Sequence, residues 1–292
     1  MLESMTPKMF NSIILLDSIC YNKENNIRTI DNISALYNNN PKGCFVIHDD
    51  NRILGYVFSR IAGNLGFISP LAVHPEHKNK DYAQDLIKVA VQNLINMGCK
   101  SIGIDLNQST GENIGLFLTA GFELSYPTIL YKKTFPYPNI SSEHILNGND
   151  VTDEMLFAFD RKFREDFCGY SLIKDLKEAL ATSKEKVIFY LENDSIRGFV
   201  FNIKEISPYV CAGFLKEDFV IGKFLHAYGC LQNICTGEQM ILAVNSKYNH
   251  SDELIKYGFK VQEAYTRMIY KNYEGTFNSK ESTGLIARSW IQ

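Results

Sequence analysis

Residues 71–90 read LAVHPEHKNKDYAQDLIKVA, and this stretch decides the fold class. It starts as the apolar end of a strand, continues through a polar loop with two lysines, Lys78 and Lys80, and enters an amphipathic helix at Asp81. Apolar residues recur in that helix with helical spacing, so one face is expected to pack on a sheet. Backbone N–H groups at a helix start attract anions, and nearby lysines strengthen this preference. The stretch predicts an anion-binding loop between a strand and a helix.

Strands are expected on both sides of this stretch. Helical pieces precede them between residues 5 and 40, and a short helix at 112–119 ends at Ala120-Gly121-Phe122. Leading strands, a crossover helix and further strands are typical of an α/β or α+β layered fold, with a mixed sheet flanked by helices. The expected strands are 44–47, 53–59, 67–73, 101–106 and 128–133.

The second half of the chain repeats the first. CFVIHDDNRILGYVFS at 44–59 aligns without gaps on VIFYLENDSIRGFVFN at 187–202, which places Gly55 over Gly198. Ordered matches favour two copies of one unit, although two generic α/β segments could also look alike. Two shorter matches follow in chain order: IDLN at 104–107 with LAVN at 242–245, and AGFEL at 120–124 with YGFKV at 257–261.

A stiff connector separates the two halves. FPYPN at 135–139 is incompatible with a helix, and 292 residues exceed the usual size of one domain. We therefore expect an N-terminal domain at 1–134, a linker at 135–150 and a C-terminal domain at 151–292. The tail, which contains Leu285-Ile286-Ala287, is expected to add a strand to the second domain.

Composition argues against several classes of protein. A net charge of −3 and a pI of about 6.1 give no electrostatic footprint for nucleic acid or for a membrane surface. The seven cysteines have no CxxC spacing, which is typical of core thiols in a reducing cytosol. His74, Glu76 and His77 do not make a convincing metal set. We expect a cytoplasmic protein without a membrane span, a bound metal or a nucleic-acid partner.

The order of strand, LAVHPEHKNKDYAQDLI, helix, strand ending in Asn107, and short helix closed by Gly121-Phe122 resembles the GCN5-related N-acetyltransferase (GNAT) superfamily. The resemblance covers nearly the whole chain as two tandem copies. It implies two GNAT-like domains, each with a mixed, mostly antiparallel sheet that is splayed between its fourth and fifth strands. Acetyl-CoA would lie in the splay, with pantetheine paired to the fourth strand and pyrophosphate on the loop and helix start.

The resemblance also assigns the cofactor-binding residues. Val73 and Pro75 match the V-x-P of the family, Lys78 stands at its Arg/Gln position, Asp81 replaces its first glycine, and Ala83 satisfies its last Gly/Ala position. The residues that would contact acetyl-CoA are Leu71, Ala72, Val73, Lys78, Asn79, Lys80, Asp81, Tyr82, Ala83, Asn107, Asn113 and Phe117.

Two of these positions depart from the family pattern. Asp81 places a carboxylate where the phosphates should bind, and with Gln84 it forms a D-x-x-Q pattern that predicts a self-capped helix as the alternative to a working phosphate loop. Phe117 stands where the family often has a Tyr that protonates the leaving thiolate, and phenylalanine has no proton to donate. The second half lacks the lysine loop, so we expect it to be a cofactor-free copy.

Two functions remain open from the sequence. The leading hypothesis is an acyl-CoA-dependent N-acetyltransferase that moves an acetyl group from acetyl-CoA to a primary amine, on a small molecule or a peptide, by direct attack. The alternative is a catalytically silent GNAT-like protein that binds CoA weakly or binds a partner. The sequence identifies neither the acceptor nor a catalytic acid or base.

Overall fold

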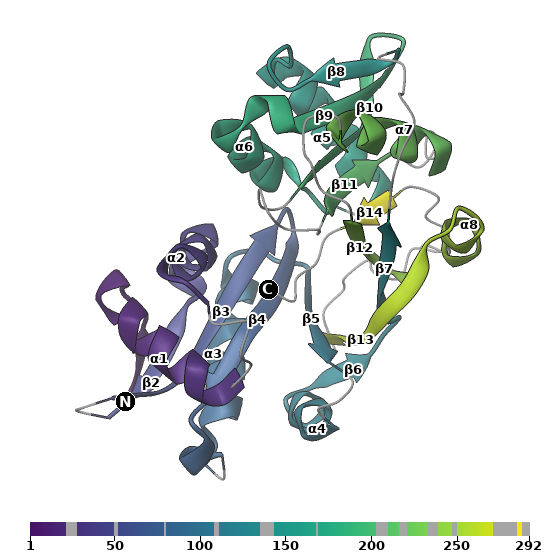
Figure 1. The fold of residues 1–292 in the computed structure, drawn as a ribbon. Coiled ribbons are helices and arrows are strands. Elements are labelled where there is room, and N and C mark those ends of the chain that lie inside the picture. The colour runs from purple at the N-terminus through teal and green to yellow at the C-terminus, as the bar shows by residue number, and fades with distance from the viewer. Residues whose placement is uncertain are drawn as a thin grey trace. The chain divides into compact units, whose positions relative to one another are not determined.

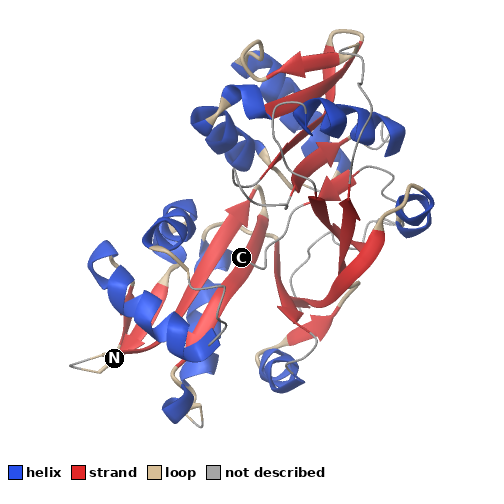
Figure 2. Cartoon of the chain, viewed as in Figure 1, coloured by secondary structure: helices blue, strands red, loops and turns tan. Residues whose placement is uncertain are grey.

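The computed structural model contains two compact units. It describes residues 1–21, 28–49, 52–78, 80–107, 111–134, 143–167, 169–202, 210–215, 221–232, 239–246, 250–270 and 285–287. Among these, the first unit comprises 1–125 and 267–270, and the second comprises 126–266 and 285–287. Helices flank the strands of each unit (Figure 2). The strands form a mixed, mostly antiparallel sheet, which confirms the predicted fold class; the parallel pair is in the first unit, and the described pairs of the second unit are antiparallel.

The sheet of the first unit has the strand order β1-β2-β3-β4-β5-β13, and β6 pairs with β13 (Figure 1). The pairs β1–β2, β2–β3 and β3–β4 are antiparallel, whereas the pair β4–β5 is parallel. The bounds are β1 Leu2–Ser4, β2 Phe45–His48, β3 Ile53–Ala62, β4 Leu65–Val73, β5 Ser101–Asn107, β6 Phe122–Leu124 and β13 Lys260–Tyr270. The helices are α1 Phe10–Tyr21, α2 Ile30–Asn39, α3 Tyr82–Asn96 and α4 Gly111–Thr119.

Helices cover both faces of this sheet. Tyr56 and Phe58 of β3 are buried in the cluster with α1 and α2, while Val57 between them is buried in the cluster with α3. Alternating side chains of a strand point to opposite faces, so α1 and α2 lie on one face and α3 lies on the other. A Cβ at Gly55 would come within 3.1 Å of Leu86 Cδ1, so this glycine lets α3 approach β3 closely.

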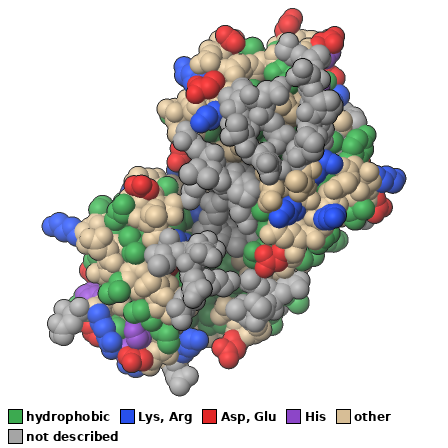
Figure 3. Space-filling model, viewed as in Figure 1, with side chains coloured by type: hydrophobic (Ala, Val, Ile, Leu, Met, Phe, Trp, Pro, Cys, Tyr) green, Lys and Arg blue, Asp and Glu red, His purple; other side chains and the backbone are tan. Residues whose placement is uncertain are grey.

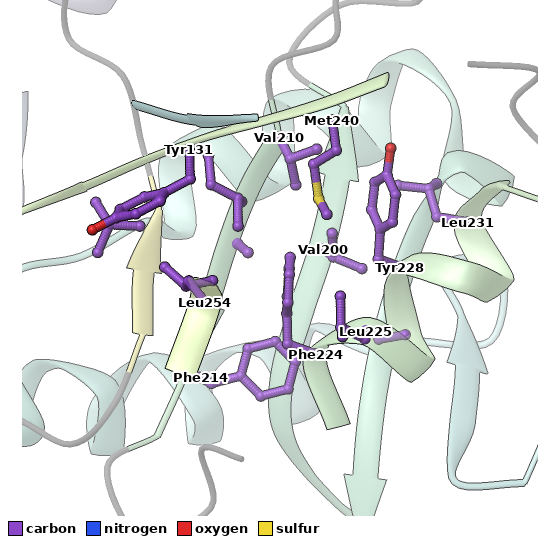
Figure 4. Packing of buried hydrophobic residues seen from close by; sticks show 14 of the residues in the cluster. Tyr131, Val200, Val210, Phe214, Phe224, Leu225, Tyr228, Leu231, Met240 and Leu254 are labelled. Carbon is purple, nitrogen blue, oxygen red and sulfur yellow. The ribbon is translucent and has the colours of Figure 1, made fainter. Parts of the chain in front are cut away.

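The second unit has the strand order β13-β7-β12-β14-β11-β10-β9-β8. Its core contains Phe214, Phe224, Tyr228 and Met240, which point toward one another from β11, α7 and β12 (Figure 4). The bounds are β7 Thr128–Thr134, β8 Ile145–Asn147, β9 Val187–Glu192, β10 Ser195–Asn202, β11 Val210–Phe214, β12 Gln239–Asn245 and β14 Leu285–Ala287. The helices are α5 Asp153–Asp166, α6 Ile173–Thr182, α7 Ile221–Gln232 and α8 Ser251–Lys256.

The two aligned hairpins have the same register. Ile47 pairs with Gly55 in β2 and β3, and Tyr190 pairs with Gly198 at the aligned positions of β9 and β10. Both hairpins shift register at the next step, so the bulge also falls at the aligned positions, Leu54 and Arg197. The shorter matches agree with this: β5 and β12 both end in asparagine, and the Gly121 and Gly258 φ angles are 94° and 82°.

The last strand of each half pairs outside the unit that the sequence predicted. Strand β7, expected to close the first half, lies in the second unit and pairs with β12. The end of β13, from the second half, lies in the first unit and pairs with β6. The prediction that β7 closes the first half was therefore wrong, because a local pattern specifies a strand but not its partner. The predicted domain bounds stay a prediction: an N-terminal domain at 1–134, a linker at 135–150 and a C-terminal domain at 151–292. Residues 135–142 of the linker lie outside the described part.

A buried ion pair anchors the end of β13 in the first unit. Arg267 Nε donates to Asp105 Oδ1 at 2.5 Å, and its Nη2 donates to Oδ2 at 2.6 Å. The two side chains are 6% and 0% exposed, and the guanidinium also lies 5.5 Å from the centroid of the Phe67 ring. Such a bidentate pair satisfies both carboxylate oxygens and fixes one register of β13 against β5.

Candidate functional site

Strand β4 leaves its parallel neighbour after three paired residues. The register joins Leu65, Gly66 and Phe67 to Ser101, Ile102 and Gly103, although β4 continues to Val73 and β5 to Asn107. Between Ile68 and Leu71, β4 has two residues where β3 has one, which is a β-bulge. A bulge bends its strand, so β4 turns away from β5 and the predicted splay is present.

The freed edge of β4 carries the carbonyl groups of Leu71 and Val73. The N–H of His74 donates to Leu54 of β3, so the even-numbered residues of this segment face β3 and the odd-numbered ones face the opposite edge. On that edge, Tyr21 OH donates to the Leu71 carbonyl at 2.7 Å, and Cys20 Sγ donates to the Val73 carbonyl at 3.4 Å. The last turn of α1 therefore contacts the edge where we expected pantetheine.

The start of α3 is not self-capped. Asp81 is the N-cap residue, but its side chain makes no capping hydrogen bond, and Gln84 Nε2 donates to Thr119 Oγ1 of α4 at 3.1 Å. The predicted D-x-x-Q cap was therefore wrong, because Gln84 finds a tertiary partner. The first turn of a helix has N–H groups without intrahelical acceptors. At α3 these groups belong to Tyr82, Ala83 and Gln84, and no Asp81 carboxylate oxygen occupies them.

The loop before α3 is charged and exposed. Lys78, Lys80 and Asp81 are exposed, while Tyr82 and Ala83 are half-buried. Lys80 Nζ lies 5.4 Å from the centroid of the Tyr82 ring and donates to its hydroxyl at 3.5 Å. Two ammonium groups and a row of free N–H groups can together hold a diphosphate. Asn79, also predicted here, lies outside the described residues.

The remaining predicted residues lie on β4, β5 and α4. Ala72 is buried against α1 and α2, whereas Leu71 and Val73 pack on the α3 side. Asn107 is the last residue of β5, and Asn113 is exposed on α4. Phe117 is 2% exposed and contacts Phe122 edge-on with ring centroids 5.2 Å apart, so it acts as a core residue.

The sequence reasoning missed a polar cluster beside the β4 edge. Asp17 of α1 is 1% exposed; its Oδ1 accepts from Arg28 Nη1 at 2.5 Å and from the Tyr56 hydroxyl. Cys20 and Tyr21 follow Asp17 by three and four residues, so they lie on the same side of α1. The sequence does contain a signal for this cluster: Asp17 is a charged residue on the apolar face of α1, where Ile13 and Leu16 are also buried.

The pKa values of Cys20, Tyr21 and Tyr56 in this cluster are raised. Burial, and secondarily the Asp17 charge, raises the pKa of the Cys20 thiol to about 11, although Lys78 acts in the opposite direction. Packing around its hydroxyl raises the pKa of Tyr21 to about 12, even though the residue is 40% exposed. Burial also raises the pKa of Tyr56 well above its usual range. At neutral pH all three groups carry their protons and can only donate or accept hydrogen bonds.

His74, Glu76 and His77 in the turn before Lys78 bring ligand-type atoms within 4.8 Å of one another. Arg52 already contacts two of them: its Nη1 lies 3.6 Å from Glu76 Oε2, and its Nη2 lies 3.2 Å from His77 Nε2. A guanidinium at these atoms opposes a second cation there. The turn therefore supports no metal proposal.

The face that Figure 3 draws has no large patch of one charge among its described residues. Figure 3 shows acidic and basic side chains interspersed over the described part of the face that it draws. Among the described residues, no helix combines the length and the apolar character that crossing a bilayer requires.

Comparison with known proteins agrees with this geometry. Residues 10–122 match the model of the acetyltransferase (GNAT) family, which spans the chain from α1 through the loop and α3 to the start of β6. Over this segment the chain is similar to that family. No curated protein matches the sequence.

Solved structures extend the fold likeness to the whole chain. A proposed acetyltransferase of Pyrococcus horikoshii is 13% identical, with a TM-score of 0.70 over 100% of this chain and 94% of its own. A GCN5-related N-acetyltransferase of Sphaerobacter thermophilus is 13% identical, with a TM-score of 0.65 over 97% of this chain and 98% of its own. A third, from Anabaena variabilis, is 10% identical with a TM-score of 0.57, over 92% and 72%. At these identities the likeness establishes the fold alone.

Proposed function

We propose that the chain is an N-acetyltransferase that moves an acetyl group from acetyl-CoA to a primary amine by direct attack. One observation carries the proposal: the β4 edge at Leu71 and Val73 is freed from β5 and leads directly into a lysine loop and an uncapped helix start. An extended thioester arm needs such an edge, and the diphosphate attached to it needs such a helix start.

The binding roles follow from this arrangement. Leu71 and Val73 would pair with the amide groups of pantetheine through the edge of β4, and Ala72 lies between them with its backbone polar groups toward β3. Lys78, Asn79, Lys80 and the first-turn N–H groups of Tyr82 and Ala83 would hold the pyrophosphate. Asn107 and Asn113 would add further contacts. Asp81 would lie beside the phosphates and oppose them, and the ring of Phe117 would stay in the core.

Direct attack is supported by the state of Cys20. Acetyl-CoA supplies a thioester. The amine nitrogen forms the C–N bond and loses one proton to water, the C–S bond breaks, and the released thiolate takes a proton from water. A covalent path through Cys20 would need its thiolate, but a pKa of about 11 keeps this thiol protonated at neutral pH.

We also propose that the chain is a cytoplasmic tandem repeat, with copies at 1–134 and 151–292 joined by 135–150. The shared hairpin register and bulge support a duplication. The lysine loop has no counterpart in the second half of the sequence, so the second copy would bind no CoA and would help to shape the acceptor site.

The experiment that tests this function is an acetyl-transfer assay. The full chain is incubated with acetyl-CoA and n-propylamine, 1,4-diaminobutane, glucosamine or glycylglycine, and amide products are measured by mass spectrometry. We expect enzyme-dependent acetylation of at least one amine, above the rate without protein. No enzyme-dependent product from any of the four would contradict the proposal.

A catalytically silent CoA-binding or partner-binding protein is the second candidate. It is favoured by the Tyr21 and Cys20 hydrogen bonds to the two edge carbonyls and by the buried Phe117 at the family's Tyr position. Acetyl-CoA binding without any acetyl transfer in the same assay would support it.

Asp81→Gly is expected to tighten acetyl-CoA binding roughly fivefold, because it removes a carboxylate about one contact distance from a phosphate, worth about 1 kcal/mol in exposed surroundings. Calorimetric titration measures the change, and Asp85→Asn, at an exposed position one turn further along α3, is the control. Equal affinity for wild type and Asp81→Gly would show that the carboxylate points away from the phosphates.

A further inference from the structure

Asp17 has one carboxylate oxygen that the described structure leaves unused. Its Oδ1 accepts from both Arg28 and Tyr56, whereas Oδ2 is buried and has no hydrogen-bond partner among the described residues. The buried Asp105 differs, since Arg267 donates to both of its oxygens. An unsatisfied buried oxygen costs about 1–3 kcal/mol. A purely structural carboxylate would gain stability from a second donor, so Oδ2 is suited to receive one from a ligand.

Asp17 Oδ2 lies close to the β4 edge along which the thioester arm of acetyl-CoA is proposed to bind. Cys20 and Tyr21 lie on the same side of α1 as Asp17 and donate to the Val73 and Leu71 carbonyls of β4. One turn of an α-helix rises about 5.4 Å. Asp17 is therefore about one helical turn away from the strand edge along which the thioester would lie. The same closeness is evident in the effect of the Asp17 charge on the pKa values of Cys20 and Tyr21.

The chemistry of the oxygen limits the ligand. An ionised carboxylate only accepts hydrogen bonds, so its ligand must present an N–H or O–H donor. Arg28 offsets the Asp17 charge, which gives a nearly neutral site where an amine need not stay charged. Tyr21, Arg28 and Cys20 are the partly exposed members of the cluster, and a ligand would enter past them.

We propose that Asp17 Oδ2 binds the amino group of the acetyl acceptor and positions its nitrogen beside the β4 edge. The acceptor is then a primary amine that donates an N–H to a buried carboxylate. This assignment rests on the proposed acetyl transfer and adds the group that selects its second substrate. Tyr56 and Arg28 act through Asp17, because they hold Oδ1 and leave Oδ2 directed to the ligand.

The test compares wild type with Asp17→Asn, whose amide keeps the shape and whose oxygen can still accept from Arg28 and Tyr56. With the oxygen on Arg28 and Tyr56, its NH₂ group stands at the Oδ2 position, where it only donates and cannot accept the amine N–H. With the amine that wild type acetylates fastest, we expect kcat/KM for the amine to fall at least tenfold, mainly through KM, because a charged hydrogen bond is worth about 1.5–3 kcal/mol. The calorimetric Kd for acetyl-CoA should be unchanged, and Asp85→Asn is the control.

Amine kinetics equal to wild type in a folded Asp17→Asn variant would overturn the assignment while leaving the transferase function intact. If the variant does not fold, a crystal structure of wild type with the same amine decides: we expect the amine nitrogen within hydrogen-bond distance of Oδ2. A buried water alone at Oδ2, with the amine bound elsewhere, would overturn it. Absence of acetyl-CoA binding or transfer in wild type would instead contradict the proposed function.

Discussion

Arg267→Ala is expected to lower the free energy of unfolding by about 3–5 kcal/mol, because it removes the guanidinium that is paired with a buried carboxylate. The Asp105 side chain is 0% exposed, and Arg267 donates a hydrogen bond to each of its two oxygens. Since Arg267 is in the part of β13 that lies in the first unit, the loss should also loosen β13 from β5. Urea unfolding followed by circular dichroism measures the first effect, and amide exchange of β5 measures the second.

Two variants separate the ion pair from simple packing. Asp105→Leu combined with Arg267→Met removes both charges, and we expect it to recover most of the lost stability, as buried pairs replaced by apolar residues commonly do. Glu76→Gln breaks an exposed contact with Arg52 and should cost less than about 1 kcal/mol. A loss below about 1 kcal/mol for Arg267→Ala would show that Asp105 reaches water or another donor.

The combined Lys78→Ala and Lys80→Ala variant is expected to weaken acetyl-CoA binding roughly thirtyfold. Each exposed lysine beside a diphosphate contributes about 1 kcal/mol, and 1.4 kcal/mol corresponds to a tenfold change in Kd. Lys88→Ala is the matched control, because Lys88 is an exposed lysine further along α3. Calorimetric titration at two salt concentrations measures the effect.

The dependence of acetyl-CoA binding on salt concentration gives a second test of this prediction. Binding to wild type should weaken as salt rises from 50 to 500 mM, on the order of severalfold, whereas the double variant should lose most of that dependence. Equal affinity of the double variant and wild type would mean that the diphosphate rests elsewhere than on this loop.

Much of the first unit follows from sequence pattern. The apolar spacing after Asp81 predicted α3, which runs from Tyr82 to Asn96. The gapless alignment of residues 44–59 with 187–202 predicted two copies of one unit, and the two hairpins have the same register and a bulge at aligned positions. These features succeed because neighbours within a few residues specify them.

Three features were beyond that reasoning because they depend on contacts distant in sequence. Gln84 donates a hydrogen bond to Thr119 of α4 rather than to the start of α3, so the D-x-x-Q pattern gave a wrong prediction of a self-capped helix. The β7 sequence predicted a strand but could not say that β12 is its neighbour. The role of Asp17 appears only when Tyr56, 39 residues away, reaches it.

The most direct test of the central claim is a calorimetric titration of acetyl-CoA into the full wild-type chain, up to millimolar ligand. The account predicts saturable heat with one acetyl-CoA per chain. The first unit has a β4 edge that leaves β5 and an uncapped α3, while the second half lacks the lysine loop. No heat at millimolar acetyl-CoA would contradict it, and two equivalents per chain would contradict the assignment of the second half as a copy without CoA.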